Sequence, residues 1–275
     1  MIYNTILVHL GIHDGAAPQL KFARELASRF DANLIGFAAG DVHPITAPPP
    51  GVIMDDEFLR LETREIERRL EALKAEFEAD SEREGGGSLR TAVGDPTREL
   101  AIAARAADLV VAVLGRGSGE YDGRDAVDLG ELIHSAGRPV LIPRDDLEPL
   151  RANSVVVAWK DAREARRAVV DAMPFLVHAR EVLVATIADR EQDLARASAA
   201  DVVRYLVNHG ARARAEVFSP GDRQDGESLA DISRQNGADL IVSGAYGHTR
   251  FREWLLGGVT RSLLKEGTLH RLMSA

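Results

Sequence analysis

The sequence repeats itself, and this repeat limits the fold more than any other feature. The segment ILVHL at 6–10 matches VVVAW at 155–159, and ANLIGF at 32–37 matches EVLVAT at 181–186, both at an offset of 149 residues. The spacing of these apolar segments is therefore the same in both halves. A chain of 275 residues has room for two domains of ordinary size, so we predict two copies of one fold.

A third repeated segment shows that one half is longer. ADLVV at 107–111 matches ADLIV at 238–242 at an offset of only 131 residues, so the N-terminal half holds 18 additional residues (149 − 131). We assign them to the proline-rich segment 40–56, because proline fixes φ and removes a hydrogen-bond donor. We interpret this segment as a spacer loop, and a lid over a pocket is the alternative. The predicted domain limits are 1–146 and 152–275.

The apolar pattern between the repeated segments predicts helices. Apolar residues recur every three or four positions, as on the buried face of a helix. They are Leu59, Ile66, Leu70, Leu73 and Phe77 in the N-terminal half, and Ala165, Ala168, Val169, Ala172, Met173 and Leu176 in the C-terminal half. Short strands rich in Val, Ile and Leu that alternate with helices are typical of a parallel sheet covered on both faces. We therefore predict the α/β class, with two tandem doubly wound, Rossmann-like domains.

Composition narrows the classes of function. The chain has 43 acidic and 34 basic residues, a formal net charge of −9, and no run of Lys or Arg that would bind nucleic acid or anionic lipid. It has no cysteine, which removes disulfides, thiolate nucleophiles and Cys-based metal sites. Its apolar runs are much shorter than the ~20 residues of a membrane helix. We expect a soluble, cytoplasmic protein with neither nucleic acid nor membrane as a partner.

Glycines follow the apolar segment 238–242 at an informative spacing. Gly244 is followed by two residues and Gly247, and then by nine residues and Gly257. Glycine lets main-chain N–H groups approach a phosphate closely, and a helix that begins near Gly257 would direct its free amides at the same anion. The alternative is that these glycines are ordinary turn and helix-cap residues.

This spacing resembles the nucleotide-binding signature of ATP-binding universal stress proteins. By that resemblance, Gly244 would lie beside the ribose or adenine. Ala158, Trp159 and Asp161 belong to the same candidate site, and the ring of Trp159 could either pack on a base or belong to the core or a dimer contact. The triphosphate would lie among Gly247, His248, Arg250, Gly257, Gly258, Val259 and Thr260. Two positions depart from the family pattern. Gly258 stands where the family usually has Ser or Thr, and Lys160 stands where it often has Asp.

The signature is missing from the N-terminal half. Val113 and Arg116 occupy the positions that correspond to Gly244 and Gly247, and Gly11 occupies the position of the family's Asp. We therefore predict that the N-terminal domain is structural and that only the C-terminal domain binds nucleotide.

No enzymatic motif accompanies the glycines. The sequence lacks the P-loop, the nucleophile elbow of hydrolases and the H-E-x-x-H helix. His9 and His13 have a spacing suggestive of metal ligands, but they lie at a predicted strand end, and we expect no metal site. We assign surface or capping roles to His134, His178, His209 and His270. We assign no catalytic residue.

The resemblance implies a regulatory stress-response protein that binds ATP or a related adenine nucleotide and at most hydrolyses it slowly. The alternative is a scaffold or chaperone-like protein that binds no nucleotide. In the family, domains pair through their last strands, so we predict that PVLIP at 139–143 pairs with HRLMS at 270–274 within the chain. This pairing would form an intrachain pseudo-dimer, and a homodimer of the whole chain is compatible with it.

Overall fold

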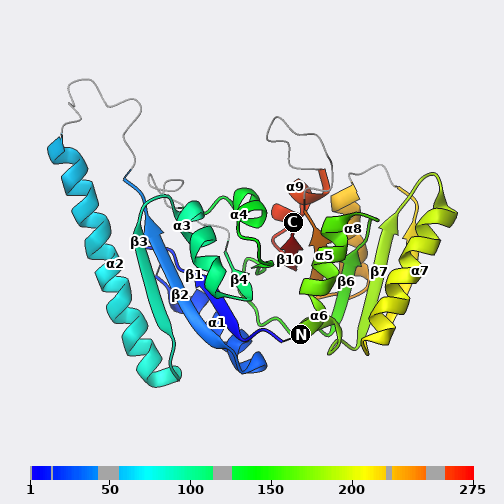
Figure 1. The fold of residues 1–275 in the computed structure, drawn as a ribbon, viewed down its shortest axis with the longest axis horizontal. Coiled ribbons are helices and arrows are strands. Elements are labelled where there is room, and N and C mark those ends of the chain that lie inside the picture. Colours follow the sequence, from blue (N-terminus) through cyan, green and yellow to red (C-terminus); the bar gives the residue numbers. More distant parts are fainter. Residues whose placement is uncertain (1, 14, 43–55, 114–125, 221–224, 246–257) are drawn as a thin grey trace. The chain divides into compact units, whose positions relative to one another are not determined.

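The computed structural model of the chain describes residues 2–13, 15–42, 56–113, 126–220, 225–245 and 258–275 (Figure 1). The chain divides into two compact units. The first unit consists of residues 4–136, and the second of residues 137–275 together with the first three residues. The limits of 1–146 and 152–275 for the repeated domains stay a prediction. The compact units have a different boundary, because the strand formed by 140–142 lies in the second unit.

The first unit contains a parallel sheet with strand order β3-β2-β1-β4. Its elements are β1 (Thr5–His9), α1 (Ala17–Phe30), β2 (Asn33–Gly40), α2 (Asp56–Glu84), β3 (Ser88–Val93), α3 (Pro96–Ala103), the 3-10 helix η1 (Ala104–Ala106), β4 (Leu109–Val111) and α4 (Leu129–Ser135).

The second unit repeats this plan with strand order β5-β10-β9-β6-β7-β8. Its elements are β5 (Val140–Ile142), β6 (Ser154–Ala158), α5 (Arg163–Asp171), α6 (Met173–Leu176), β7 (Glu181–Ile187), α7 (Gln192–Asn208), β8 (Ala213–Phe218), α8 (Asp225–Gln235), β9 (Leu240–Gly244), α9 (Gly258–Leu264) and β10 (His270–Ser274). The chain runs outward from β6 to β8 and returns to the other side of β6 with β9, so its crossover connections place helices on both faces. The predicted doubly wound α/β class is confirmed.

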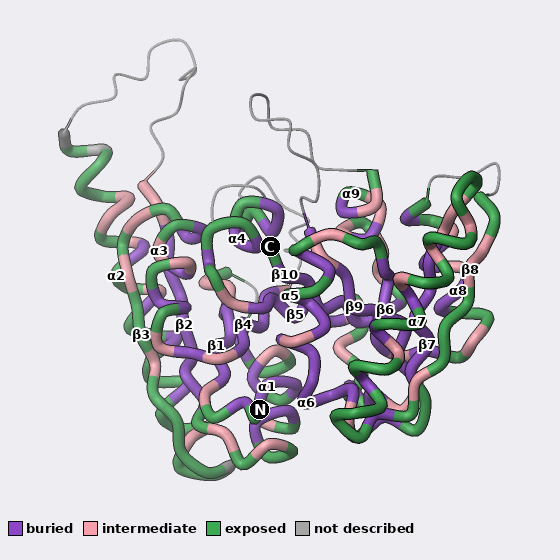
Figure 2. Tube along the Cα trace, turned by 45° about the vertical axis from the view of Figure 1, so that its right-hand side comes forward, coloured by how far each residue is buried: buried purple, intermediate pink, exposed green. Residues whose placement is uncertain are grey.

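The central strands are buried along nearly their whole length, as the tube in Figure 2 shows. Parallel strands covered on both faces need continuous apolar runs, and β6 and β9 supply them. The predicted helix faces lie in the core except for Leu59, which is exposed. Gly210 has a φ of +89° just after α7, the left-handed conformation that commonly ends a helix.

The extra length of the N-terminal half is not confined to the predicted segment 40–56. Helix α2 has 29 residues, whereas α7, at the corresponding place in the second unit, has 17. The helix is therefore 12 residues longer, and it accounts for much of the excess. Most of the segment 40–56 lies outside the described residues, so its interpretation as a loop or lid stays a prediction.

Strands β5 and β10 pair, as expected from the family resemblance, and their direction is antiparallel. Arg271 lies opposite Ile142, Leu272 opposite Leu141, and Met273 opposite Val140. On its other side β10 pairs with β9 in the parallel direction. Strand β5 is thus the only antiparallel member among the described strands of the second unit.

His270 begins β10 and is only 1% exposed, so the predicted surface or capping role is wrong. Its Nδ1 accepts a hydrogen bond from the main-chain N–H of Arg144 at 3.3 Å. Burial, together with the charges of Arg144 and Arg271, lowers the pKa of His270 to about 4. The imidazole is therefore neutral in the folded protein at neutral pH.

This burial predicts an acid-dependent loss of stability. In the unfolded chain His270 takes up a proton near the ordinary histidine pKa of 6.5, whereas in the folded chain it does so only near 4. Its contribution is therefore complete above pH 6.5, and about 3 kcal/mol of it is lost as the pH falls to 4. Urea unfolding across this range should show a flatter pH dependence for His270→Asn than for the wild type. Parallel curves would contradict the assignment.

Candidate functional site

The carboxyl ends of β6 and β9 lie side by side in the second unit. The two strands are parallel neighbours, and Ala158 at the end of β6 is opposite Ser243. Strands β7 and β8 lie on one side of this pair and β10 on the other, so the strand order reverses between β6 and β9. Ligands of open α/β sheets bind at this kind of switch point. Both predicted segments, after Ala158 and after Ser243, begin at this edge.

Gly244 ends β9 and touches the main chain of α5. A Cβ on Gly244 would lie 2.5 Å from both the carbonyl carbon of Glu164 and the nitrogen of Ala165. No side chain fits in that space, because the neighbouring atoms belong to a helix backbone. The structure therefore places Gly244 at the predicted edge and gives its lack of a side chain a packing reason.

Trp159 follows β6 directly, but its indole belongs to the core. The residue is 6% exposed, and its Nε1–H donates to Oγ of Ser198 in α7 at 3.0 Å. Its main-chain N–H continues the sheet by donating to the carbonyl oxygen of Ala185 at 2.8 Å. In this arrangement Trp159 can offer main-chain atoms to a ligand, but its ring is not free to stack on a base.

Asp161 lies in the turn between β6 and α5 and forms an ion pair with Arg166. The Arg166 Nη2 to Asp161 Oδ1 distance is 2.5 Å, and the side chains are 62% and 58% exposed. Asp161 does not cap α5, since Ala162 is the N-cap residue and its side chain accepts no hydrogen bond. An exposed ion pair contributes little to stability, so this carboxylate can exchange partners at small cost.

Helix α9 begins at Gly258, which is exposed, and continues with the half-buried Val259 and the buried Thr260. It packs closely on α8 at Gly226. A Cβ on Gly226 would lie 2.6 Å from Ser262 Cβ and 2.9 Å from the carbonyl oxygen of Val259. Sequence reasoning missed Gly226, although a glycine inside a helical pattern is a signal of close packing.

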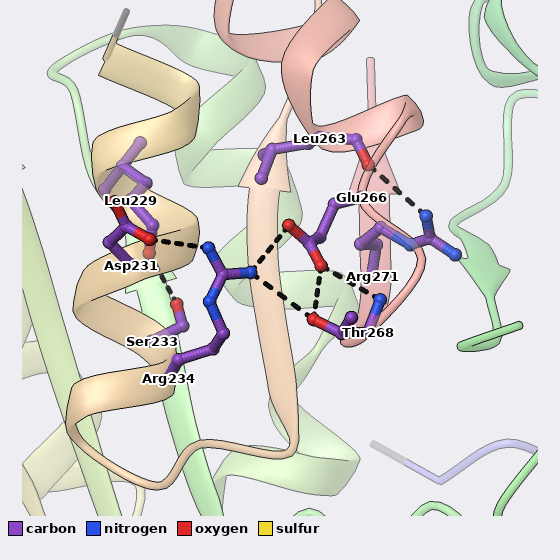
Figure 3. A network of polar contacts seen from close by, with 8 residues as sticks. All are labelled: Leu229, Asp231, Ser233, Arg234, Leu263, Glu266, Thr268 and Arg271. Carbon is purple, nitrogen blue, oxygen red and sulfur yellow. Dashed lines mark hydrogen bonds and ion pairs between the residues drawn. The ribbon is translucent and has the colours of Figure 1, made fainter. Parts of the chain in front are cut away.

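A polar network fixes the segment after α9 to α8 (Figure 3). Arg234 of α8 donates to Asp231 at 2.6 Å, to Glu266 at 2.8 Å and to Thr268 at 3.3 Å. Burial raises the pKa of Glu266, but hydrogen bonds from Thr268 and Arg234 outweigh it and hold this pKa below its usual range. The carboxylate therefore stays ionised, and the segment that follows α9 is held against α8.

Four predicted residues, Gly247, His248, Arg250 and Gly257, lie outside the described residues. Their convergence on a phosphate stays a prediction. The described part of the chain contains no group of three or more His, Asp or Glu residues arranged to hold a metal ion. In the same part of the chain, no helix combines the length and apolar character that crossing a membrane requires.

Comparison with known proteins identifies the second unit. A model of the universal stress protein family matches residues 154–269, from the start of β6 to the residue before β10. The second unit belongs to the universal stress protein family. The matched range includes the ends of β6 and β9 at the switch point and the residues of the glycine signature.

Solved structures extend the likeness in fold to the whole chain. A universal stress protein from Archaeoglobus fulgidus DSM 4304 is 15% identical with a TM-score of 0.67, and the match covers 98% of each chain. A functionally unknown protein from Pseudomonas aeruginosa PAO1 is 15% identical with a TM-score of 0.60, over 99% of this chain and 92% of that one. Comparison with curated protein sequences found no match. The first unit thus repeats the fold of the universal stress protein domain.

The first unit has a small cavity at the carboxyl end of its own β1. Its volume is about 150 Å³, and Gly11, Gly15, Arg68 and Arg69 are among its lining residues. Both arginines donate to Glu65, and these hydrogen bonds lower the pKa of Glu65 to about 2. The arginines are therefore already paired, and the cavity belongs to the unit whose glycine signature is absent.

The contact between Gly244 and α5 predicts different costs for two glycines of the universal stress protein domain. Gly244→Ala should destabilise the protein by ~1–3 kcal/mol, because the methyl group overlaps a helix backbone. Gly258→Ala, at an exposed helix start, should stay within about 1 kcal/mol of the wild type. Denaturant unfolding of both variants measures the difference. A Gly244→Ala variant as stable as the wild type would contradict the prediction, because α5 would then be able to move away from β9 at no cost.

Proposed function

We propose that the universal stress protein domain of the second unit binds ATP or a related adenine nucleotide, and that the protein regulates a stress response through this binding. One observation carries the proposal. Strand β9, which leads directly into the glycine signature, ends beside β6 at the switch point of the sheet. The signature and the strand edge where such folds bind ligands are therefore contiguous.

Main-chain groups supply most of the proposed contacts. The amides at Gly247, Gly257 and Gly258 would hold the phosphates, and His248 and Arg250 would add charge. Gly258 lacks the hydroxyl that Ser or Thr would add, so its amide is its only donor. Val259 and Thr260 continue the helix behind it, and Thr260 is 3% exposed.

The nucleoside would lie against the turn after Ala158. Asp161 is the nearest carboxylate in the sequence to the position of the family's Asp, and its exposed ion pair with Arg166 is weak enough to open. The buried indole of Trp159 excludes base stacking on that ring in this arrangement. We therefore propose that the base is bound by main-chain atoms at the end of β6 and not by an aromatic side chain.

Universal stress proteins are generally regulatory proteins without enzymatic activity, and no residue of the sequence is assigned a catalytic role. We propose binding as the function, with at most slow ATP hydrolysis. A second candidate, a scaffold that binds no nucleotide, is favoured by the buried indole of Trp159, which offers no surface to a base. The two candidates differ in whether the purified protein carries a nucleotide.

Nucleotide released from the protein separates these candidates. The purified protein is denatured, the precipitate is removed, and the supernatant is analysed by chromatography for adenine nucleotides. We expect ATP or a related nucleotide in proportion to the protein. A supernatant without nucleotide, from protein that also fails to take up added ATP, would support the scaffold and contradict our proposal.

Two substitutions test which half holds the site. Gly247→Val should weaken ATP binding by about tenfold or more, because a branched side chain blocks the approach of a phosphate. Arg116→Ala, at the corresponding position of the first unit, is the matched control and should leave affinity unchanged. Equal losses from the two variants would refute the assignment of one site in the second unit.

A further inference from the structure

Arg271, in β10, is a wholly buried charged residue that the proposed nucleotide site does not use. Its exposed fraction is 0%. Its Nη2 donates to the carbonyl oxygen of Pro143 at 2.5 Å. Its Nη1 donates to the carbonyl oxygen of Leu263 at 3.4 Å (Figure 3). Its Nε has no hydrogen-bond partner among the described residues. The guanidinium is thus held by main-chain carbonyl groups.

The charge on Arg271 is costly to bury and is retained. Burial lowers its pKa to about 10, and the more distant charges of Asp145 and Glu266 oppose that shift. A pKa of about 10 leaves the guanidinium protonated at neutral pH. A buried charge without a carboxylate at hydrogen-bonding distance is weak evidence for stability, but such groups can select a pairing partner or register.

The contacts of Arg271 depend on the segment that follows β5. Besides the bond to Pro143, the main-chain N–H of Asp145 donates to the carbonyl oxygen of Gly267 at 2.8 Å. A Cβ on Gly267 would overlap the carboxylate of Asp145, so the Asp145 side chain lies directly against this glycine. The residues after β5 therefore pack against the start of β10, where they accommodate the buried charge.

The two paired strands are equivalent in the repeat but differ in charge. At the offset of 131 residues, Arg271 of β10 corresponds to Val140 of β5, and Leu272 corresponds to Leu141. The pair of β5 with β10 therefore contains a single arginine. A pair of β10 with β10 of a second copy, in the same register, would contain two of them.

We propose that Arg271 selects the pairing partner of β10, favouring β5 of its own chain and opposing β10 of a second copy. In the observed register Arg271 is opposite Ile142, and Ile142 corresponds to Met273 in the repeat. In a pair of two β10 strands with this register, Arg271 would therefore be opposite Met273 of the partner subunit. Two copies of β10 paired in this way would place Arg271 and the Arg271 of the partner subunit diagonally on one face, about 7–8 Å apart. Both charges would be buried and would repel each other.

The acceptor that Arg271 uses would also be less accessible in that pair. Ser274 corresponds to Pro143, and its carbonyl oxygen already accepts a hydrogen bond from the N–H of Ala245 at 2.8 Å. The incoming guanidinium would have to share this oxygen. The two strands that correspond in the repeat thus differ in charge, since only β10 has an arginine. The pair within the chain, β5 with β10, contains one buried charge instead of two.

A single cysteine can report the disfavoured pair, because the chain has none of its own. Residue 272 would lie opposite itself in a pair of two β10 strands, at a Cα separation that permits a disulfide. Leu272→Cys is therefore combined with Arg271→Met, which keeps the volume and removes the charge, or with Arg271→Lys, which keeps the charge. Each protein is refolded at high concentration in mildly acidic buffer, oxidised, and analysed by non-reducing electrophoresis.

We expect little covalent dimer with Leu272→Cys alone or with Arg271→Lys, and at least about tenfold more with Arg271→Met. Equal amounts of covalent dimer in all three proteins would overturn the proposal. A large amount of covalent dimer in the Leu272→Cys protein that retains Arg271 would also overturn the proposal.

A second experiment keeps the proposal testable if Arg271→Met does not fold. Leu141→Cys with Leu272→Cys joins the strands that pair within the chain, because these residues are opposite each other. Adding Val140→Arg places a second arginine in that pair. We expect the internal disulfide to form at least about tenfold more slowly than without Val140→Arg. An unchanged rate would show that the pair tolerates two buried arginines and would overturn the proposal.

Discussion

The parallel pairing of β9 with both β6 and β10 is the interaction on which the second unit depends. On one side it brings the end of β9 to the end of β6, and on the other it supports the strand that meets β5. Helix α5 can lie across this arrangement only because Gly244 has no side chain. The position of the glycine signature is thus a consequence of strand order and of one close contact between backbones.

Sequence patterns predicted the elements well because each depends on local chemistry. The repeat, the apolar strands and the helix periodicity give the order of elements in both units. The pairing of β5 with β10 was predicted from the resemblance to a family whose domains pair through their last strands. Patterns failed where three-dimensional contacts decide. A glycine such as Gly244 looks the same whether it admits a phosphate or a helix backbone. A strand-end tryptophan such as Trp159 does not reveal that its indole turns toward α7, and a histidine in a strand reads as polar although His270 is buried.

The two units show how a duplicated fold can diverge. The first unit has a longer helix α2 and lacks the glycine signature, whereas the second retains it after β9. Arg271 in place of the corresponding Val140 distinguishes the paired strands as well. In the role that we propose for it, the single buried charge of Arg271 favours the pairing of β10 with β5 of the same chain.

Isothermal titration calorimetry of the full chain with ATP tests the central claim most directly. The account predicts saturable binding of one nucleotide per chain, since only the second unit carries the signature at its switch point. The absence of saturable heat, in protein shown to be folded and free of nucleotide, would contradict it. Binding of two nucleotides per chain would contradict the assignment of a single site.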